Sequence, residues 1–238
     1  MRLLRNESVG SIGWRAGVSP SYGTRRIRGH SPLRLTAGVV ASIVLTTLAL
    51  SNESIAFGAT GATSINLVAN GSFEHPVVKG VPGGGDYQLF QLGQTVSGWS
   101  VVGVAGSVGI IARNFYVGAN KFPAQAGGQF LDLTGDSNTT TGVSENVKTV
   151  PNKRYVLSFY VAACPYGGCL STDAVKVLLN GKQVMIARTR TTKGQTTLSW
   201  KRFSKAFISA SATTTVEFLN GDPPTELLNG LDNISLVR

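Results

Sequence analysis

The chain has 238 residues and a formal net charge of +10, contains 29 glycines, and has only 14% charged residues. Its hydrophobic content of 42% excludes both a disordered chain and a multispan membrane protein. After residue 59, Lys and Arg form no dense run, which argues against a nucleic-acid-binding domain.

The net charge is shared equally between the first 59 residues and the rest of the chain. Residues 1–59 hold seven Arg and two Glu, and residues 60–238 hold fifteen Lys or Arg and ten Asp or Glu, so each part carries +5. A mildly basic domain favours acidic partners such as uronic-acid polymers or anionic walls. The alternative is that this charge serves solubility alone.

The first 59 residues have the layout of a secretory leader. Residues 35–50 form an uncharged apolar run that follows several arginines, and Ala56-Phe57-Gly58-Ala59 places small residues where an A-x-A cleavage site requires them. We therefore predict a signal peptide cleaved after Ala59 and a secreted or cell-surface protein. An uncleaved N-terminal anchor is the alternative, although a spanning helix needs about 20 apolar residues and this run has sixteen.

The remainder, residues 60–238, is predicted to be one all-β domain. Large residues alternate with small or polar ones, as in Tyr155, Leu157, Phe159 and Val161, which is typical of half-buried strands. Asn180-Gly181 between two such runs predicts a hairpin. Many short strands separated by turns indicate a sandwich or a barrel. The predicted strands lie near residues 65–70, 86–92, 97–103, 107–112, 129–134, 142–148, 153–163, 173–180, 183–189, 198–207, 213–219 and 231–237.

The two cysteines, Cys164 and Cys169, lie within one short segment. In an exported chain this spacing predicts a local disulfide that fixes the shape of a loop. A metal site would need further soft ligands nearby, and a redox pair would usually have the C-x-x-C spacing.

Five segments together resemble a known family, the cell-wall proteins called domain of unknown function 642, and equally the bacterial surface proteins labelled choice-of-anchor. The segments are 66–74, 98–99, 126–133, 149–159 and 231–236, and the resemblance covers residues 65–237. It implies the galactose-binding jelly roll of carbohydrate-binding modules, an extracellular location, and binding of cell-wall polysaccharide, with pectin-like acidic polymers favoured. Plant members usually carry two such domains, whereas this chain carries one.

The resemblance also implies a structural calcium ion between the first and last strands, held by Glu74 and Asp232. Calcium takes carboxylates and backbone carbonyls as ligands, and a buried carboxylate needs such a partner. Asp132 and Asn70 are lesser candidates for the same role. The alternative is that these acids end strands and face water or a lysine.

Aromatic side chains in loops are the candidates for sugar binding, because sugar rings stack on aromatic faces and polar groups read the hydroxyls. Trp99 and Trp200 lie within strand-like runs and are expected in the core. The candidate ligand-binding residues lie in or near predicted loops: Tyr87, Phe115, Tyr116 and Tyr166, with Arg113 placed to pair with a uronate carboxylate. The alternative for each is that it anchors its own loop.

No motif for catalysis is evident, so we predict a non-catalytic protein. After the leader the only histidine is His75, and no G-x-S-x-G elbow occurs. Two alternatives stay open: a small glycan-active hydrolase using paired carboxylates, and a structural surface or matrix protein that binds another protein. We expect a monomer that contacts no nucleic acid, and a membrane only through an uncleaved leader.

Overall fold

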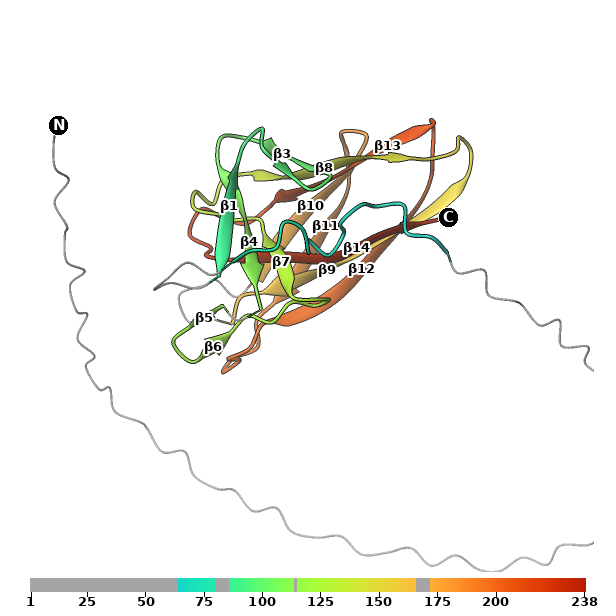
Figure 1. Ribbon diagram of the computed structural model, residues 1–238. Coiled ribbons are helices and arrows are strands. Elements are labelled where there is room, and N and C mark those ends of the chain that lie inside the picture. Colours follow the sequence, from blue (N-terminus) through green and yellow to red (C-terminus); the bar gives the residue numbers. More distant parts are fainter. Residues whose placement is uncertain (1–63, 80–85, 114, 166–171) are drawn as a thin grey trace, which may run out of the picture. The chain divides into compact units, whose positions relative to one another are not determined.

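The computed structural model describes residues 64–79, 86–113, 115–165 and 172–238 (Figure 1). The predicted leader, Tyr166 and Cys169 lie outside these residues. In the part of the chain that is described, no helix is long and apolar enough to cross a membrane.

The described residues form fourteen strands, nearly all of them in two sheets. In chain order they are β1 (Tyr87–Gln91), β2 (Thr95–Val96), β3 (Trp99–Gly103), β4 (Ser107–Ala112), β5 (Tyr116–Val117), β6 (Asn120–Lys121), β7 (Gln129–Asp132), β8 (Thr141–Lys148), β9 (Arg154–Ala163), β10 (Thr172–Leu179), β11 (Lys182–Arg190), β12 (Ser199–Ile208), β13 (Thr213–Asn220) and β14 (Asn229–Val237).

Two six-stranded antiparallel sheets form a jelly-roll β-sandwich, which confirms the predicted fold class. One sheet has the order β1-β4-β7-β14-β9-β12 and the other β11-β10-β13-β8-β3-β2. In Figure 1 the sheet with β9, β12 and β14 lies below the one with β3, β8 and β13. Sheet neighbours such as β14 and β7 are distant in the sequence, so the two sheets draw together segments from the whole domain.

The main core lies between the sheets and follows the alternation seen in the sequence. Leu157, Phe159 and Val161 of β9 are fully buried, and the Phe159 ring meets Phe218 of the opposite sheet with 4.9 Å between ring centroids. Trp99 is also fully buried, and its indole N–H donates to the carbonyl of Ala69 at 3.0 Å. The prediction that Trp99 is a core residue is therefore confirmed.

A second, smaller apolar cluster supports the segment that follows β4. Phe122, Phe130 and Leu198 are buried in it, with Phe115 and Trp200 packed against them. The Trp200 indole N–H donates to the carbonyl of Pro123 at 2.9 Å, and its ring meets Phe130 edge to face. Trp200 therefore packs against a buried cluster, in line with the core role predicted for it. The same packing fixes the β5–β6 hairpin and the loop after it.

Residues 65–70 are not a strand, so that prediction is wrong. The Asn66 side chain accepts from the backbone N–H groups of Val68 and Leu236 and donates to the carbonyl of Ile234. One backbone bond, from Leu67 N–H to the Leu236 carbonyl, joins the same segments. An amide side chain thus takes over most of the pairing that a strand would supply.

The short strands β2, β5 and β6 were not predicted. Each has only two residues, which is too few to show alternation. The β5–β6 hairpin is held from outside, because Lys121 exchanges backbone hydrogen bonds with Thr196 and Leu198. Tertiary contacts rather than local propensity therefore define it.

Candidate functional site

Four of the predicted ligand-binding residues lie on one side of the domain, which we call the aromatic–arginine surface: Tyr87, Arg113, Phe115 and Tyr116. Tyr87 begins β1, Arg113 follows β4, and Tyr116 begins β5. The rings of Tyr87 and Phe115 meet edge to face with 6.2 Å between centroids. Tyr116 is 68% exposed, so its ring face is available to a ligand.

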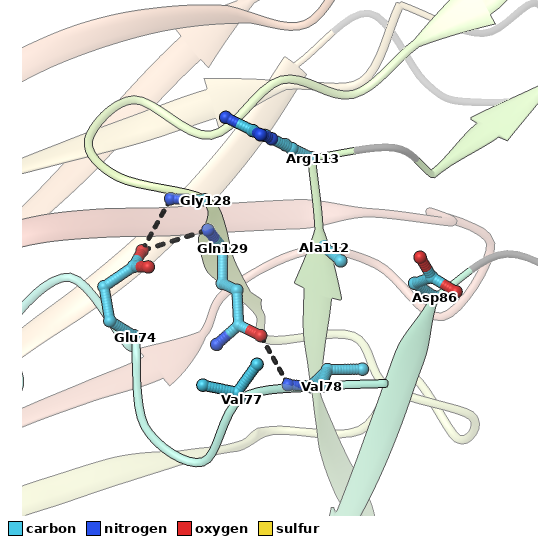
Figure 2. Close-up of a pocket in the computed structure, with 8 residues that line it drawn as sticks. All are labelled: Glu74, Val77, Val78, Asp86, Ala112, Arg113, Gly128 and Gln129. Carbon is cyan, nitrogen blue, oxygen red and sulfur yellow. Dashed lines mark hydrogen bonds between the residues drawn. The ribbon is translucent and has the colours of Figure 1, made fainter. Parts of the chain in front are cut away.

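Three depressions adjoin one another along this surface. The first is lined by Glu74, Val77, Val78, Asp86, Ala112, Arg113, Gly128 and Gln129 (Figure 2) and has a volume of about 410 Å³. The second, of about 430 Å³, shares Arg113 with it and includes Phe115, Tyr116 and Lys121. The third, of about 330 Å³, shares Phe115 with the second and includes Tyr87 and Asp132.

The first depression has a rigid, hydrogen-bonded floor. Glu74 Oε1 accepts from the backbone N–H groups of Gly128 and Gln129 at 2.9 and 3.0 Å. The Gln129 amide accepts from Val78 N–H at 2.6 Å and donates to the carbonyl of Phe73 at 2.8 Å. Figure 2 shows Glu74 and Arg113 flanking the Gly128 backbone. These bonds fix the loop that precedes β7.

The second depression contains a basic residue that sequence reasoning missed. Lys121 is exposed and lies across the β5–β6 hairpin from Tyr116, its Cα partner in the ladder. Among the described residues, no Asp or Glu lines this depression, whereas Arg113 and Lys121 both do. In the sequence, Lys121 follows Tyr116 by a few residues, with Gly118-Ala119 between them. The sequence alone did not show that these residues form a hairpin, which is what brings the two side chains together.

The third depression contains two carboxylates that the scaffold already uses. Asp132 accepts from the N–H groups of Thr134 and Asn229, both at 3.0 Å. Burial raises the pKa of Asp132 to about 6, while these hydrogen bonds act to lower it. Asp136 hydrogen-bonds the Ser107 hydroxyl, which donates to it.

Glu74 and Asp232, the predicted calcium ligands, contact the same loop. Asp232 is fully buried, and its Oδ2 accepts from the N–H groups of Gln125 and Ala126 at 2.8 and 2.9 Å. A register shift after Asp232 leaves both Leu231 and Ile234 in the main core, so Asp232 is buried beneath residues 125–126 instead of between the sheets. Burial, with a smaller contribution from the charge of Glu74, raises the pKa of Asp232 to about 7, while the backbone hydrogen bonds act to lower it.

The remaining predicted site residues are placed as follows. The Asn70 side chain donates to the carbonyl of His75 and accepts from its backbone N–H, and so spans the turn that contains Glu74. Among the described residues, no three His, Cys, Asp or Glu side chains converge as a metal-binding group. Cys164 is buried after the end of β9, and since Cys169 lies outside the described residues, the disulfide stays a prediction.

The chain belongs to the family described as "Protein of unknown function (DUF642)", which matches residues 66–226. The resemblance seen in the sequence is thereby confirmed. A comparison with curated proteins finds no match.

Several solved structures are similar to the domain. A cyclase from Fischerella sp. TAU is 14% identical, with 73% of this chain and 97% of that one covered and a TM-score of 0.49. A family 35 carbohydrate-binding module from an environmental isolate is 17% identical over 63% and 93% of the chains, with a TM-score of 0.40. The CBM22-1 xylan-binding domain of Paenibacillus barcinonensis Xyn10C is 19% identical over 66% and 97%, with a TM-score of 0.39. Likenesses this distant carry no weight for the function of this chain.

Proposed function

We propose that this chain is a secreted, non-catalytic domain that binds polysaccharide through the aromatic–arginine surface. One observation carries the proposal: Tyr87, Arg113, Phe115 and Tyr116, chosen from the sequence as sugar-binding candidates, line depressions that adjoin one another. A row of shallow sites is the shape that an extended polymer needs, whereas a single small molecule would favour one enclosed cavity.

The second depression has the chemistry to bind an acidic sugar. The exposed Tyr116 ring can stack on the C–H face of a sugar, and Arg113 and Lys121 supply positive charge beside it. Since none of the described residues that line this depression is a carboxylate, a uronate there would meet the attraction of Arg113 and Lys121. The net charge of +5 on residues 60–238 acts in the same direction at longer range.

The two carboxylates in the third depression, Asp132 and Asp136, support the proposal that the chain is non-catalytic. A glycosidase needs one carboxyl group to exchange a proton with the substrate and another to attack or activate water. Asp132 and Asp136 are instead hydrogen-bonded to Thr134, Asn229 and Ser107 of their own scaffold. Secretion is supported by the sequence of the leader.

A structural calcium ion between Glu74 and Asp232 is part of the same proposal. Two carboxylates lie close enough for the charge of one to raise the pKa of the other, and carboxylate oxygens suit calcium. The ion would link the N-terminal segment, the 125–129 loop and β14, and so would stabilise the wall of the first depression without touching the sugar.

The test is binding of the purified protein to a panel of acidic and neutral polysaccharides at low and high salt. We expect retention by polyuronates that weakens with salt, because surface charge is screened. Arg113→Ala should lower polyuronate affinity about tenfold, the scale of one charge-assisted pair. Tyr116→Ala should weaken binding to acidic and neutral polymers alike.

Arg202→Ala is the matched control, since Arg202 is exposed on β12 and lines none of the three depressions. It removes the same charge and should leave affinity nearly unchanged. If Arg113→Ala and Arg202→Ala lose the same affinity for polyuronates, the effect comes from net charge and not from the position of Arg113. A folded protein that binds no polysaccharide would overturn the proposal and favour a protein partner.

A further inference from the structure

Buried oxygen atoms without a hydrogen-bond partner gather at one place in the described structure. Among the described residues six such side-chain atoms occur, and one of them belongs to Glu145. The other five are both carboxylate oxygens of Asp173, Thr189 Oγ1, Asp222 Oδ2 and Asn229 Oδ1. Buried polar groups are nearly always paired, so such atoms call for an explanation, and an ion or a water is a usual one.

Backbone pairing and hydrogen bonds bring these four residues together around Ala174. Thr189 is directly opposite Asp173 in the β10–β11 ladder, so the two side chains share a face of the sheet. Asp222 Oδ1 accepts from Ala174 N–H, and the Asn229 amide donates to the Ala174 carbonyl at 2.7 Å. Asn229 comes from the opposite sheet, and β10 and β14 are in contact.

These atoms are buried away from bulk solvent. Asp173 and Asn229 are fully buried, and Thr189 is 7% exposed. Burial, together with the charges of Asp222 and Glu226, raises the pKa of Asp173 to about 9, while the backbone N–H of Cys164 acts to lower it. Arg188 is exposed and lowers the pKa of Asp222, although burial outweighs it and raises that pKa to about 7. Both carboxyl groups therefore hold a proton more readily than exposed acids do, and a bound cation would favour their ionised form instead.

The chemistry of the unpaired atoms indicates what the missing partner is. All five are oxygens, from two carboxylates, one amide and one hydroxyl, and none is a donor nitrogen. Calcium accepts carboxylate, amide and other oxygen ligands in flexible geometry, whereas magnesium demands near-octahedral geometry and keeps several waters. The set contains only two acids, so it is not one of the groups of three or more His, Cys, Asp or Glu side chains that are absent among the described residues.

We propose that Asp173, Thr189, Asp222 and Asn229 form a calcium-class cation site at the end of the sandwich where β10 and β14 begin. It is distinct from the Glu74–Asp232 pair, which is bonded to the 125–129 loop. The ion would join the two sheets, because Asp173 and Asn229 belong to different ones. The site does not depend on polysaccharide binding.

The experiment compares calcium binding and thermal unfolding of the full chain and its variants after treatment with a chelator. Calcium should raise the Tm of the wild-type protein, because a ligand of the folded state alone stabilises it. Asp173→Asn keeps the shape of the side chain and removes its charge. It should lower calcium affinity at one site at least tenfold and abolish that part of the Tm rise.

Without calcium, Asp173→Asn should unfold at the same temperature as wild type or higher, because an uncompensated buried carboxylate is removed. Asp232→Asn is the matched control: it removes one carboxylate from the other pair and should leave binding at the Asp173 site unchanged. Thr189→Val, a milder change, should lower affinity several-fold and serves if Asp173→Asn fails to fold.

Three results would overturn the proposal. One is a wild-type Tm that is the same in calcium and in chelator. Another is an Asp173→Asn or Thr189→Val variant that responds to calcium as the wild type does. The third is the loss of every calcium effect in Asp232→Asn alone, which would assign the ion to the Glu74–Asp232 pair.

Discussion

At the scale of single residues, Gly127 determines how closely Glu74 approaches the loop before β7. Its φ of +67° lies in the left-handed region, and a Cβ at this position would meet the Glu74 carboxylate. A side chain in this conformation costs about 1–2 kcal/mol, and the collision adds to it. We expect Gly127→Ala to lower the free energy of unfolding by about 2–4 kcal/mol, measured by urea denaturation.

Gly118 provides the control for this prediction, because its φ is +59° and a Cβ there would meet nothing within 4 Å. Gly118→Ala should therefore cost only the conformational part, about 1–2 kcal/mol. Combining Gly127→Ala with Glu74→Ala should recover part of the loss. Equal costs for the two glycine variants would mean that the Glu74 contact has no energetic role.

At the scale of elements, alternation in the sequence predicts the long strands well and the irregular ones poorly. The runs around Leu157 and Val177 are buried on one face as expected. At Asn233, with a φ of +48°, the register shifts and the alternation breaks. Simple alternation would put the Asp232 and Ile234 side chains on the same face, and it fails there because alternation holds only while the ladder is regular.

The segment 65–70 shows a second limit of prediction from alternation, because the hydrogen bonds of a side chain there take the place of backbone pairing between strands. Asn66→Ala removes three hydrogen bonds, to Val68, Ile234 and Leu236, and should lower the free energy of unfolding by about 1–2 kcal/mol in urea denaturation. Ile65→Ala is the control, since Ile65 is 78% exposed and should change stability by under about 0.5 kcal/mol. If the two variants are equally stable, the amide does not hold the segment.

At the scale of the whole molecule, the binding surface combines residues that the sequence identifies only one by one. Tyr87, Arg113 and Tyr116 could be chosen because aromatic and guanidinium groups in loops suit sugars. That they line adjoining depressions depends on β1 pairing with β4 and on the β5–β6 hairpin. The oxygen cluster around Asp173 was not foreseen, because its members come from both sheets and from the segment after β13.

The stability of the whole domain is linked to the protonation of Glu145. This residue lies between Val143 and Val147, both in the main core, and is itself buried. Its Oε1 accepts from Ala69 N–H at 3.0 Å, and its Oε2 has no partner among the described residues. Burial raises the pKa of Glu145 above its ordinary 4.5, while the Ala69 bond acts to lower it.

A raised pKa means that the folded protein holds this proton more tightly than the unfolded chain does. The stabilisation from Glu145 is therefore complete below pH 4.5, the ordinary value, and is lost as the pH rises through the higher folded value. Glu145→Gln keeps an acceptor for Ala69 N–H and cannot ionise. The free energy of unfolding of Glu145→Gln minus that of wild type, from urea denaturation across pH, should be constant at low pH and should increase above 4.5. Asp132, Asp173, Asp222 and Asp232 titrate in both proteins and cancel in this difference, so a difference that stays flat through neutral pH would show that Glu145 remains ionised at no cost in the fold.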